Sequence, residues 1–171
     1  MEGNKLQIRP ARKADMAEID AIYARARCFM KQAGNPSQWG DSYPPAEMLQ
    51  EDLEAGQLFV LEEDGRIQGV FALIGGEDPT YGSIDGAWLN DLPYLAIHRV
   101  ASRGEIRGVT EKIVRWCFGR CRNLRIDTHP DNLPMQKAVG RCGFQRCGII
   151  RYFDGSPRIA YQHTLTEEEC P

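Results

Sequence analysis

Hydrophobic residues follow two different periods along the chain, and each period predicts a different secondary structure. Side chains of a strand alternate between two faces, whereas a helix repeats its hydrophobic positions every three or four residues. Alternating patterns or short apolar runs, which predict strands, occupy residues 6–9, 58–62, 67–73, 94–101, 123–127, 145–152 and 158–164. Helical patterns occupy residues 15–33, 46–55, 109–121 and 132–143, and a short strand is expected near Ser83–Ile84.

Turn and cap residues sharpen several of these boundaries. Asp64–Gly65 and Asp154–Gly155 each separate two apolar runs, and Asp-Gly pairs favour hairpin turns because both turn positions need positive φ. Asp15, followed three residues later by Glu18, matches a capping box at the start of the first helix. Asn132 is a suitable N-cap for the last helix.

The order of the elements predicts the fold class. It reads strand, two helices, three strands, helix, strand, helix and two strands. The strand–helix–strand–helix portion implies a parallel pair, and the flanking hairpins imply antiparallel pairs. We therefore expect an α/β fold with a single mixed sheet and helices on both faces. The 171 residues favour one domain, with a core over about residues 6–165.

Composition narrows the classes of function. The chain is 42% hydrophobic and 26% charged, with a net charge of −3. This charge argues against general binding to nucleic acid or to a membrane surface. No apolar run approaches the ~20 residues of a membrane span, and the N-terminal segment lacks the apolar core of a signal peptide. A cytoplasmic protein is expected.

The cysteines do not predict a disulfide framework, because the chain is long and its periodicity is regular. Cys117 and Cys121 share one face of a predicted helix, but no His stands near them to complete a zinc set. We expect no metal site and reduced thiols packed as small apolar groups. The six cysteines are Cys28, Cys117, Cys121, Cys142, Cys147 and Cys170.

The stretch Ile97–Cys121 carries the first candidate chemistry. A short strand runs into a loop that contains Arg103, Gly104, Arg107 and Gly108, and an amphipathic helix follows. Free N–H groups and the dipole at a helix N-terminus attract anions, and glycines allow close approach. The pattern indicates a phosphate or pyrophosphate site. A simple strand–turn–helix connection with solvated arginines fits the same residues equally well.

Two irregular segments hold large aromatic side chains. The segment between the first two helices contains Trp39 and Tyr43, and the segment before the central strand contains Tyr81 and Trp88. Aromatic residues in such segments either cap the core or line a pocket.

The motifs VASRGEIRGVT, DTHPDN and GRCGF, in this order of elements, resemble the GCN5-related N-acetyltransferase (GNAT) superfamily from about Leu6 to Leu165. The resemblance implies a mostly antiparallel sheet with a splayed central parallel strand pair. It implies acetyl-CoA as co-substrate and transfer of the acetyl group to the amine of a small molecule. In that family the loop and helix N-terminus bind the pyrophosphate, and the splayed strand pairs with the pantetheine arm. A homodimer through the C-terminal hairpin is compatible with this fold.

Carried over by residue, the resemblance implies where acetyl-CoA is held. The backbone of the splayed strand would meet the pantetheine, the loop would bind the pyrophosphate, and an Asn would lie near the thiol end. Arg103 would reach the 3′-phosphate or lie in solvent. The implied cofactor residues are Val100, Ala101, Arg107, Gly108, Val109, Thr110, Asn132 and Met135.

The chain departs from the family pattern at three positions. Glu105 stands where Gln or Arg is usual, and Thr110 replaces a small residue. We expect the Glu105 side chain to point outward. Many members carry a Tyr that protonates the leaving thiolate, and here that position is Val139. Cys142 is close in sequence but is expected in the core.

His98 is the principal candidate for the general base, because it lies beside the splayed strand end and imidazole titrates near neutrality. Strand alternation could instead turn it to the far side as a hydrogen-bonded core residue. A strand N–H near Val100 would stabilise the oxyanion. His129 fits a turn residue better than a base. Other candidates, acting through water, are Glu62, Glu63, Asp78 and Asp127.

We expect the aromatic residues of the two irregular segments to form a wall of the acceptor pocket: Trp39, Tyr43, Tyr81 and Trp88. Asp78, Asp85 and Asp91 would attract a cationic amine there, or are ordinary surface acids. Two alternative functions remain. One is a non-catalytic acyl-CoA-binding or sensing module, and the other is a protein or peptide N-acetyltransferase with an open groove.

Overall fold

The computed structural model describes residues 5–169. Eight strands form one sheet in the order β1-β2-β3-β5-β6-β8-β7-β4. The strands are β1 (Leu6–Pro10), β2 (Leu58–Glu63), β3 (Arg66–Gly75), β4 (Asp85–Gly86), β5 (Leu95–Ser102), β6 (Asn123–Thr128), β7 (Gln145–Arg151) and β8 (Pro157–Thr164). The α-helices are α1 (Met16–Gln32), α2 (Ala46–Glu54), α3 (Val109–Phe118) and α4 (Leu133–Arg141). Short 3-10 turns cover Lys13–Asp15, Pro79–Tyr81 and Glu167–Glu169.

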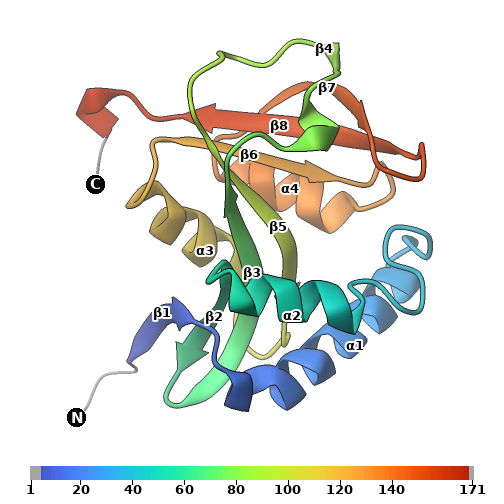
Figure 1. Cartoon of the computed structure of the whole chain (residues 1–171), viewed down its shortest axis with the longest axis vertical. Coiled ribbons are helices and arrows are strands. Elements are labelled where there is room, and N and C mark those ends of the chain that lie inside the picture. Colours follow the sequence, from blue (N-terminus) through green and yellow to red (C-terminus); the bar gives the residue numbers. More distant parts are fainter. Residues whose placement is uncertain (1–4, 170–171) are drawn as a thin grey trace.

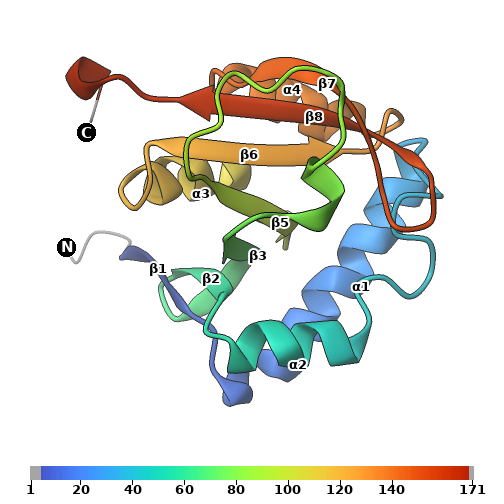
Figure 2. The ribbon, with the colours of Figure 1, turned by 45° about the horizontal axis from the view of Figure 1, so that its top comes forward.

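The predicted mixed, mostly antiparallel sheet is confirmed. β5 and β6 run parallel, and the other neighbouring strands described in residues 5–169 run antiparallel. Helices cover both faces. Val60 and Val70 pack with α1 and α2, whereas their neighbours Leu61 and Phe71 pack with α3 and α4. Figures 1 and 2 both show α1 and α2 below β6 and β8. These two helices therefore do not cover the strands beyond β5.

The predicted splay of the central parallel pair is confirmed as well. The β5–β6 ladder consists of three residue pairs and ends at Ile97 and Ile126. β5 then continues beside β3 as far as Ser102. On the β6 side, the backbone from His98 to Ser102 therefore has no strand partner within the described residues. This open edge starts at the middle of the sheet (Figure 1).

A bulge in β5 accompanies the splay. Ala72 pairs with His98, but Val70 pairs with Ala101, so β5 holds one extra residue there. Arg99 has a φ of 54°, which is unusual for a residue with a Cβ. The Tyr23 hydroxyl of α1 donates to the Arg99 carbonyl at 2.7 Å. The bulge is thus fixed by a helix on one face of the sheet.

Some local predictions were wrong at their boundaries. The capping box at Asp15 does not form, because its carboxylate instead accepts from the Arg12 N–H at 2.7 Å and from the Arg9 guanidinium at 2.8 Å. The helix predicted to reach Cys121 ends at Phe118, before Gly119. The turn at Asp64–Gly65 has positive φ at both residues, as predicted.

Three further observations concern residues 5–169. None of the helices there has the length and apolarity needed to cross a membrane. No group of His, Cys, Asp and Glu side chains in this part of the chain could hold a metal ion. Its five cysteines are free, and Cys170 lies outside the described residues. Burial raises the pKa of the Cys117 thiol to about 12.

Candidate active site

Two cavities meet at the open edge of β5. The first, called here the His98 cavity, has a volume of about 250 Å³ and lies beside His98 and the end of β6. The second, called the α3 cavity, has a volume of about 380 Å³ and lies at the N-terminus of α3 between α1 and α4. Both are lined by Met30, Val100, Asn132 and Met135. These four residues therefore form a boundary that the two cavities share.

The α3 cavity has the features of an anion site. Gly108 adopts a left-handed conformation with a φ of 71° and precedes α3, and no side chain caps this helix end. The first-turn N–H groups of a helix have no partner within it, so those of Val109 and Thr110 are free to bind a ligand. Val100 and Ala101 of the open β5 edge complete this wall.

The residues implied for acetyl-CoA binding are placed as follows. All of them except Arg107 line the α3 cavity: Val100, Ala101, Gly108, Val109, Thr110, Asn132 and Met135. The side chain of Arg107 is exposed and outside the lining. Its carbonyl accepts from Lys112 Nζ at 2.8 Å, which helps to fix the loop.

Charged side chains of the loop turn away from the α3 cavity. Glu105 pairs with Arg66 on β3 at 2.9 Å, so its carboxylate does not face the free N–H groups. Arg103 pairs with Glu18 of α1 and donates to the Ile67 carbonyl at 2.6 Å. The alternative prediction that Arg103 lies free in solvent is therefore wrong, since its side chain is 15% exposed. The cation that lines the cavity without an ion pair in residues 5–169 is Arg25.

Asn132 lies at the junction of the two cavities. As predicted, it caps α4, with Oδ1 accepting from Met135 N at 3.2 Å. Its Nδ2 donates to Gln38 Oε1 at 2.9 Å, and Asn35 Nδ2 donates to the same oxygen at 2.8 Å. Asn35 is 2% exposed and its Oδ1 has no hydrogen-bond partner. One residue in the lining of the α3 cavity thus has a buried acceptor without a partner.

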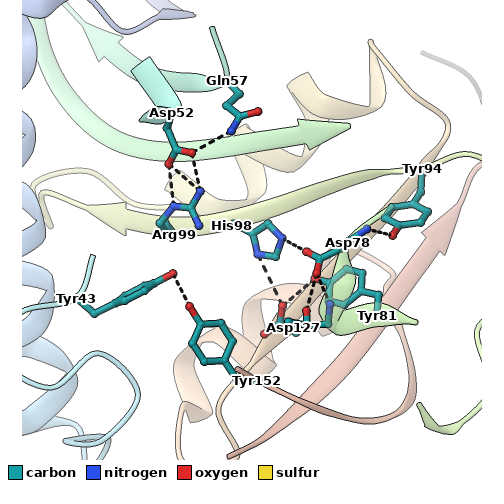
Figure 3. Close-up of polar contacts among 11 residues, drawn as sticks. Tyr43, Asp52, Gln57, Asp78, Tyr81, Tyr94, His98, Arg99, Asp127 and Tyr152 are labelled. Atoms are coloured by element: carbon teal, nitrogen blue, oxygen red, sulfur yellow. Dashed lines mark hydrogen bonds and ion pairs between the residues drawn. The ribbon is translucent and has the colours of Figure 1, made fainter. Parts of the chain in front are cut away.

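The His98 cavity contains a histidine between two carboxylates (Figure 3). His98 Nε2 lies 2.8 Å from Asp78 Oδ2, and Nδ1 lies 3.8 Å from Asp127 Oδ1. The Tyr81 hydroxyl donates to Asp127 Oδ1 at 2.7 Å. His98 faces this cavity and not the far side of the sheet.

The Asp78 contact selects the tautomer of His98. Burial alone would raise the pKa of Asp78, but hydrogen bonds from His98 and Thr80 lower it to about 2. An ionised carboxylate only accepts, so Nε2 carries the proton. In the neutral ring, Nδ1 then keeps its lone pair and faces the gap toward Asp127. The arrangement holds a base nitrogen beside a fixed carboxylate.

Half of the predicted aromatic wall lines the His98 cavity. Trp39 and Tyr43 do so, together with Tyr152 and Phe153 from the turn between β7 and β8. The hydroxyls of Tyr43 and Tyr152 lie 3.2 Å apart (Figure 3). Tyr81 and Trp88, whose ring centroids lie 5.0 Å apart, pack instead in a separate core cluster.

The other predicted residues lie elsewhere. The Trp88 ring stacks under Arg125 and lies outside the lining of the His98 cavity. Asp85 and Asp91 are exposed and also outside it. Glu62 pairs with Arg9 on the β1–β2 side of the sheet. The remaining residues outside the lining are Glu63, His129, Val139 and Cys142, of which Val139 is completely buried.

Several lining residues were not singled out from the sequence. Gln38, Thr128, Tyr152 and Arg158 line the His98 cavity, and Asn35 lines the α3 cavity. Tyr152 and Arg158 flank the predicted Asp154–Gly155 turn. An aromatic residue and a cation beside a turn are the only sequence pattern that could have indicated them as site residues. Their approach to β6 depends on strand pairing, which the local pattern does not specify.

Solved structures place the chain among known proteins. A GNAT-family acetyltransferase from Streptococcus agalactiae 2603 is similar with a TM-score of 0.86 and 30% identity, over 95% of this chain and 96% of that chain. One from Listeria monocytogenes 4b F2365 gives 0.70 and 17%, over 96% and 97%. The aminoglycoside acetyltransferase AAC(6')-Ib, solved with coenzyme A and kanamycin, gives 0.63 and 20%, over 94% and 95%. No protein-family model and no curated protein matches the sequence. The extent and identity of the first similarity show that the chain belongs to the GNAT family of acetyltransferases.

Proposed function

We propose that this chain transfers an acetyl group from acetyl-CoA to the amine of a small molecule. Acetyl-CoA occupies the α3 cavity and the acceptor occupies the His98 cavity. The observation that carries the proposal is the meeting of the two cavities at Val100, Asn132 and Met135. Reacting groups that enter from opposite sides reach each other there, and such positioning is a large part of catalysis.

The α3 cavity fits coenzyme A chemically. The free N–H groups of Val109 and Thr110, with the Arg25 guanidinium, suit a pyrophosphate. The open β5 edge offers backbone partners to an amide-containing arm, and the unsatisfied Asn35 Oδ1 accepts one amide N–H. When bound, acetyl-CoA supplies a thioester carbonyl as electrophile and a thiolate as leaving group.

Side chains of the His98 cavity prepare the acceptor. Asp127, held by Tyr81, attracts the incoming ammonium. His98 Nδ1 takes one proton from it and produces the free amine that attacks. Asp78 keeps the ring in the required tautomer and stabilises the imidazolium that results.

Two groups remain for the later steps. The backbone N–H of Val100, on the open edge, donates to the developing oxyanion. Since Val139 is buried in the core, the proton for the thiolate comes from another residue. The Tyr152 hydroxyl belongs to the lining of the His98 cavity and lies 3.2 Å from that of Tyr43, and it is the donor that we propose for this proton.

The size of the His98 cavity supports a small acceptor. Its volume of about 250 Å³ lies below the roughly 300–1,000 Å³ of sites for drug-sized ligands. AAC(6')-Ib holds kanamycin, a much larger amine. A peptide chain would also need an extended groove. We therefore favour a small amine over both an aminoglycoside and a peptide as the acceptor.

The cofactor assignment is tested by calorimetric titration with acetyl-CoA. Gly108→Asp puts a carboxylate beside the proposed pyrophosphate site, where like charges repel, and should weaken binding at least tenfold, or about 1.4 kcal/mol. Gly65→Asp is the matched control, because Gly65 also has positive φ but lies in the β2–β3 turn. Equal affinities for the two variants, or no binding by the wild type, would disprove the assignment. Thiol release with a panel of small amines then tests transfer.

A further inference from the structure

Arg158 is a buried cation in the wall of the His98 cavity. It is 5% exposed. Its Nη1 donates to Ser156 Oγ at 2.8 Å and to the Pro157 carbonyl at 3.0 Å. Among residues 5–169, no carboxylate lies within 4.0 Å of the guanidinium. A buried charge without a counter-ion is unfavourable, so this arrangement favours an anionic partner from outside the chain.

Two other arginines with largely buried side chains are held by closer partners. Arg99 also lines the cavity, but Asp52 holds it through contacts of 2.7–3.0 Å. Arg125 has no carboxylate partner in the described residues either, but its guanidinium lies 4.0 Å from the ring centroids of Trp88 and of Tyr94, and its Nη2 donates to the Asn90 carbonyl at 2.8 Å. For Arg158 the single aromatic contact is with Tyr152, at 5.2 Å. Within the described residues its hydrogen bonds use Nη1 alone, so Nε and Nη2 remain available to a ligand.

Strand register relates Arg158 to the proposed base. Ala160 of β8 pairs with Asp127, and Arg158 lies two residues before Ala160 on the same face of the sheet. Two residues of a strand span about 7 Å. The carboxylate that faces His98 Nδ1 and the free guanidinium are therefore neighbours along one face, at the separation of two groups of one small molecule.

We propose that the acceptor is an amine that also carries a carboxylate, which places it in the amino-acid class. Its ammonium lies at His98 and Asp127, and its carboxylate lies on Arg158. This inference rests on the proposed acetyltransferase function. A polyamine or aminoglycoside would leave Arg158 without a counter-ion, and a simple acid would leave Asp127 without a cation.

The first test uses the full-length wild-type protein, acetyl-CoA, and thiol release as the readout. Each amino acid is compared with its carboxamide and its decarboxylated amine, and spermidine and kanamycin are included. We expect at least one amino acid to exceed its carboxamide at least tenfold in kcat/KM. Carboxamides or polyamines that match or exceed every amino acid would overturn the inference and leave the transferase function intact.

Arg158→Gln provides the second test. It should raise KM for the preferred amino acid at least tenfold, with little change in kcat and little change for the carboxamide. Arg158→Lys should restore part of the affinity, because it returns the charge without the bidentate geometry. Arg146→Gln, on an exposed position of β7, is the control. Equal losses for acid and amide would show that Arg158 is only structural, which contradicts the inference.

A third measurement separates failure of this inference from failure of the proposed function. Thermal unfolding with coenzyme A is followed with and without the amino acid or its amide. Only the amino acid should raise Tm, and Arg158→Gln should abolish the rise. If no acceptor releases thiol although this pattern appears, the transferase proposal fails while the amino-acid site stands. An equal effect of acid and amide overturns the site.

Discussion

At His98, one hydrogen bond decides which ring nitrogen is free to act as a base. Asp78 occupies Nε2, so Nδ1 carries the lone pair. His98→Gln removes that lone pair and should lower kcat about 100-fold or more, within the range for general bases. It should also flatten the acidic limb of the pH–rate profile, because a general base acts only in its unprotonated form.

Asp78 does not account for that acidic limb, because its pKa of about 2 lies below the pH range of the assay. His163→Gln is the matched control, since His163 Nδ1 donates to the Cys142 carbonyl at 3.1 Å and the residue lines neither cavity. A His98→Gln variant that keeps the wild-type profile would exclude His98 as the base. Steady-state rates from acid to neutral pH make the comparison.

Individual residues show where sequence patterns stop being informative. Strand alternation allowed two orientations for His98, and the contact that selects one comes from Asp78, 20 residues earlier. Tyr81 is an aromatic residue in an irregular segment, which is typical of a pocket wall, yet it lies in a separate core cluster and donates to Asp127. Arg158 could not be identified, because its isolation depends on which side chains face it across β6. Such facts depend on tertiary contacts between distant segments.

At the scale of one element, the β5 bulge determines where the open edge begins. Arg99 is held there by Asp52 of α2, which is 3% exposed. Asp52→Asn removes the carboxylate charge and leaves a buried guanidinium without its counter-ion. We expect a loss of about 3 kcal/mol in the free energy of unfolding, as for other broken buried pairs. Urea denaturation measures it, and acetyl-CoA affinity should fall with it because Val100 is no longer fixed.

Asp41→Asn serves as control for this loss, since Asp41 pairs with Lys31 and its side chain is 87% exposed. Exposed pairs contribute little, so no measurable change is expected. Equal stability of the two variants would show that the Asp52–Arg99 pair does not hold the bulge.

Elements with strong local signals were predicted correctly, whereas the bulge was not. The hairpin at Asp64–Gly65 and the Asn132 cap follow from residues adjacent in sequence. The bulge requires positive φ at Arg99, a residue that gives no such signal, and its stabilising partner is 47 residues away. The capping box at Asp15 failed for a local reason, because Arg9 and the Arg12 N–H compete for the carboxylate.

At the scale of the molecule, the sheet consists of two halves joined by few contacts. β1, β2 and β3 continue into β5, and β6 continues into β8, β7 and β4. Three residue pairs join β5 to β6. The α3 cavity lies across this division, with lining from α1 on one side and α4 on the other. The order of elements was sufficient to predict the mixed sheet, and the family resemblance to predict the splay.

A ligand that bridges the two halves should stabilise both. At a concentration 100-fold above its Kd, acetyl-CoA adds about 2.7 kcal/mol if it binds only the folded state. For a chain of this length we expect Tm to rise by about 5–10 °C. Gly108→Asp should show a smaller rise at the same concentration. Hydrogen exchange locates the effect: amide protection should increase in α1 and in α4 together, because Arg25 and Arg141 line opposite sides of the cavity. Protection confined to one helix would mean that the ligand does not bridge the division, and the α3 cavity would then not be the acetyl-CoA site.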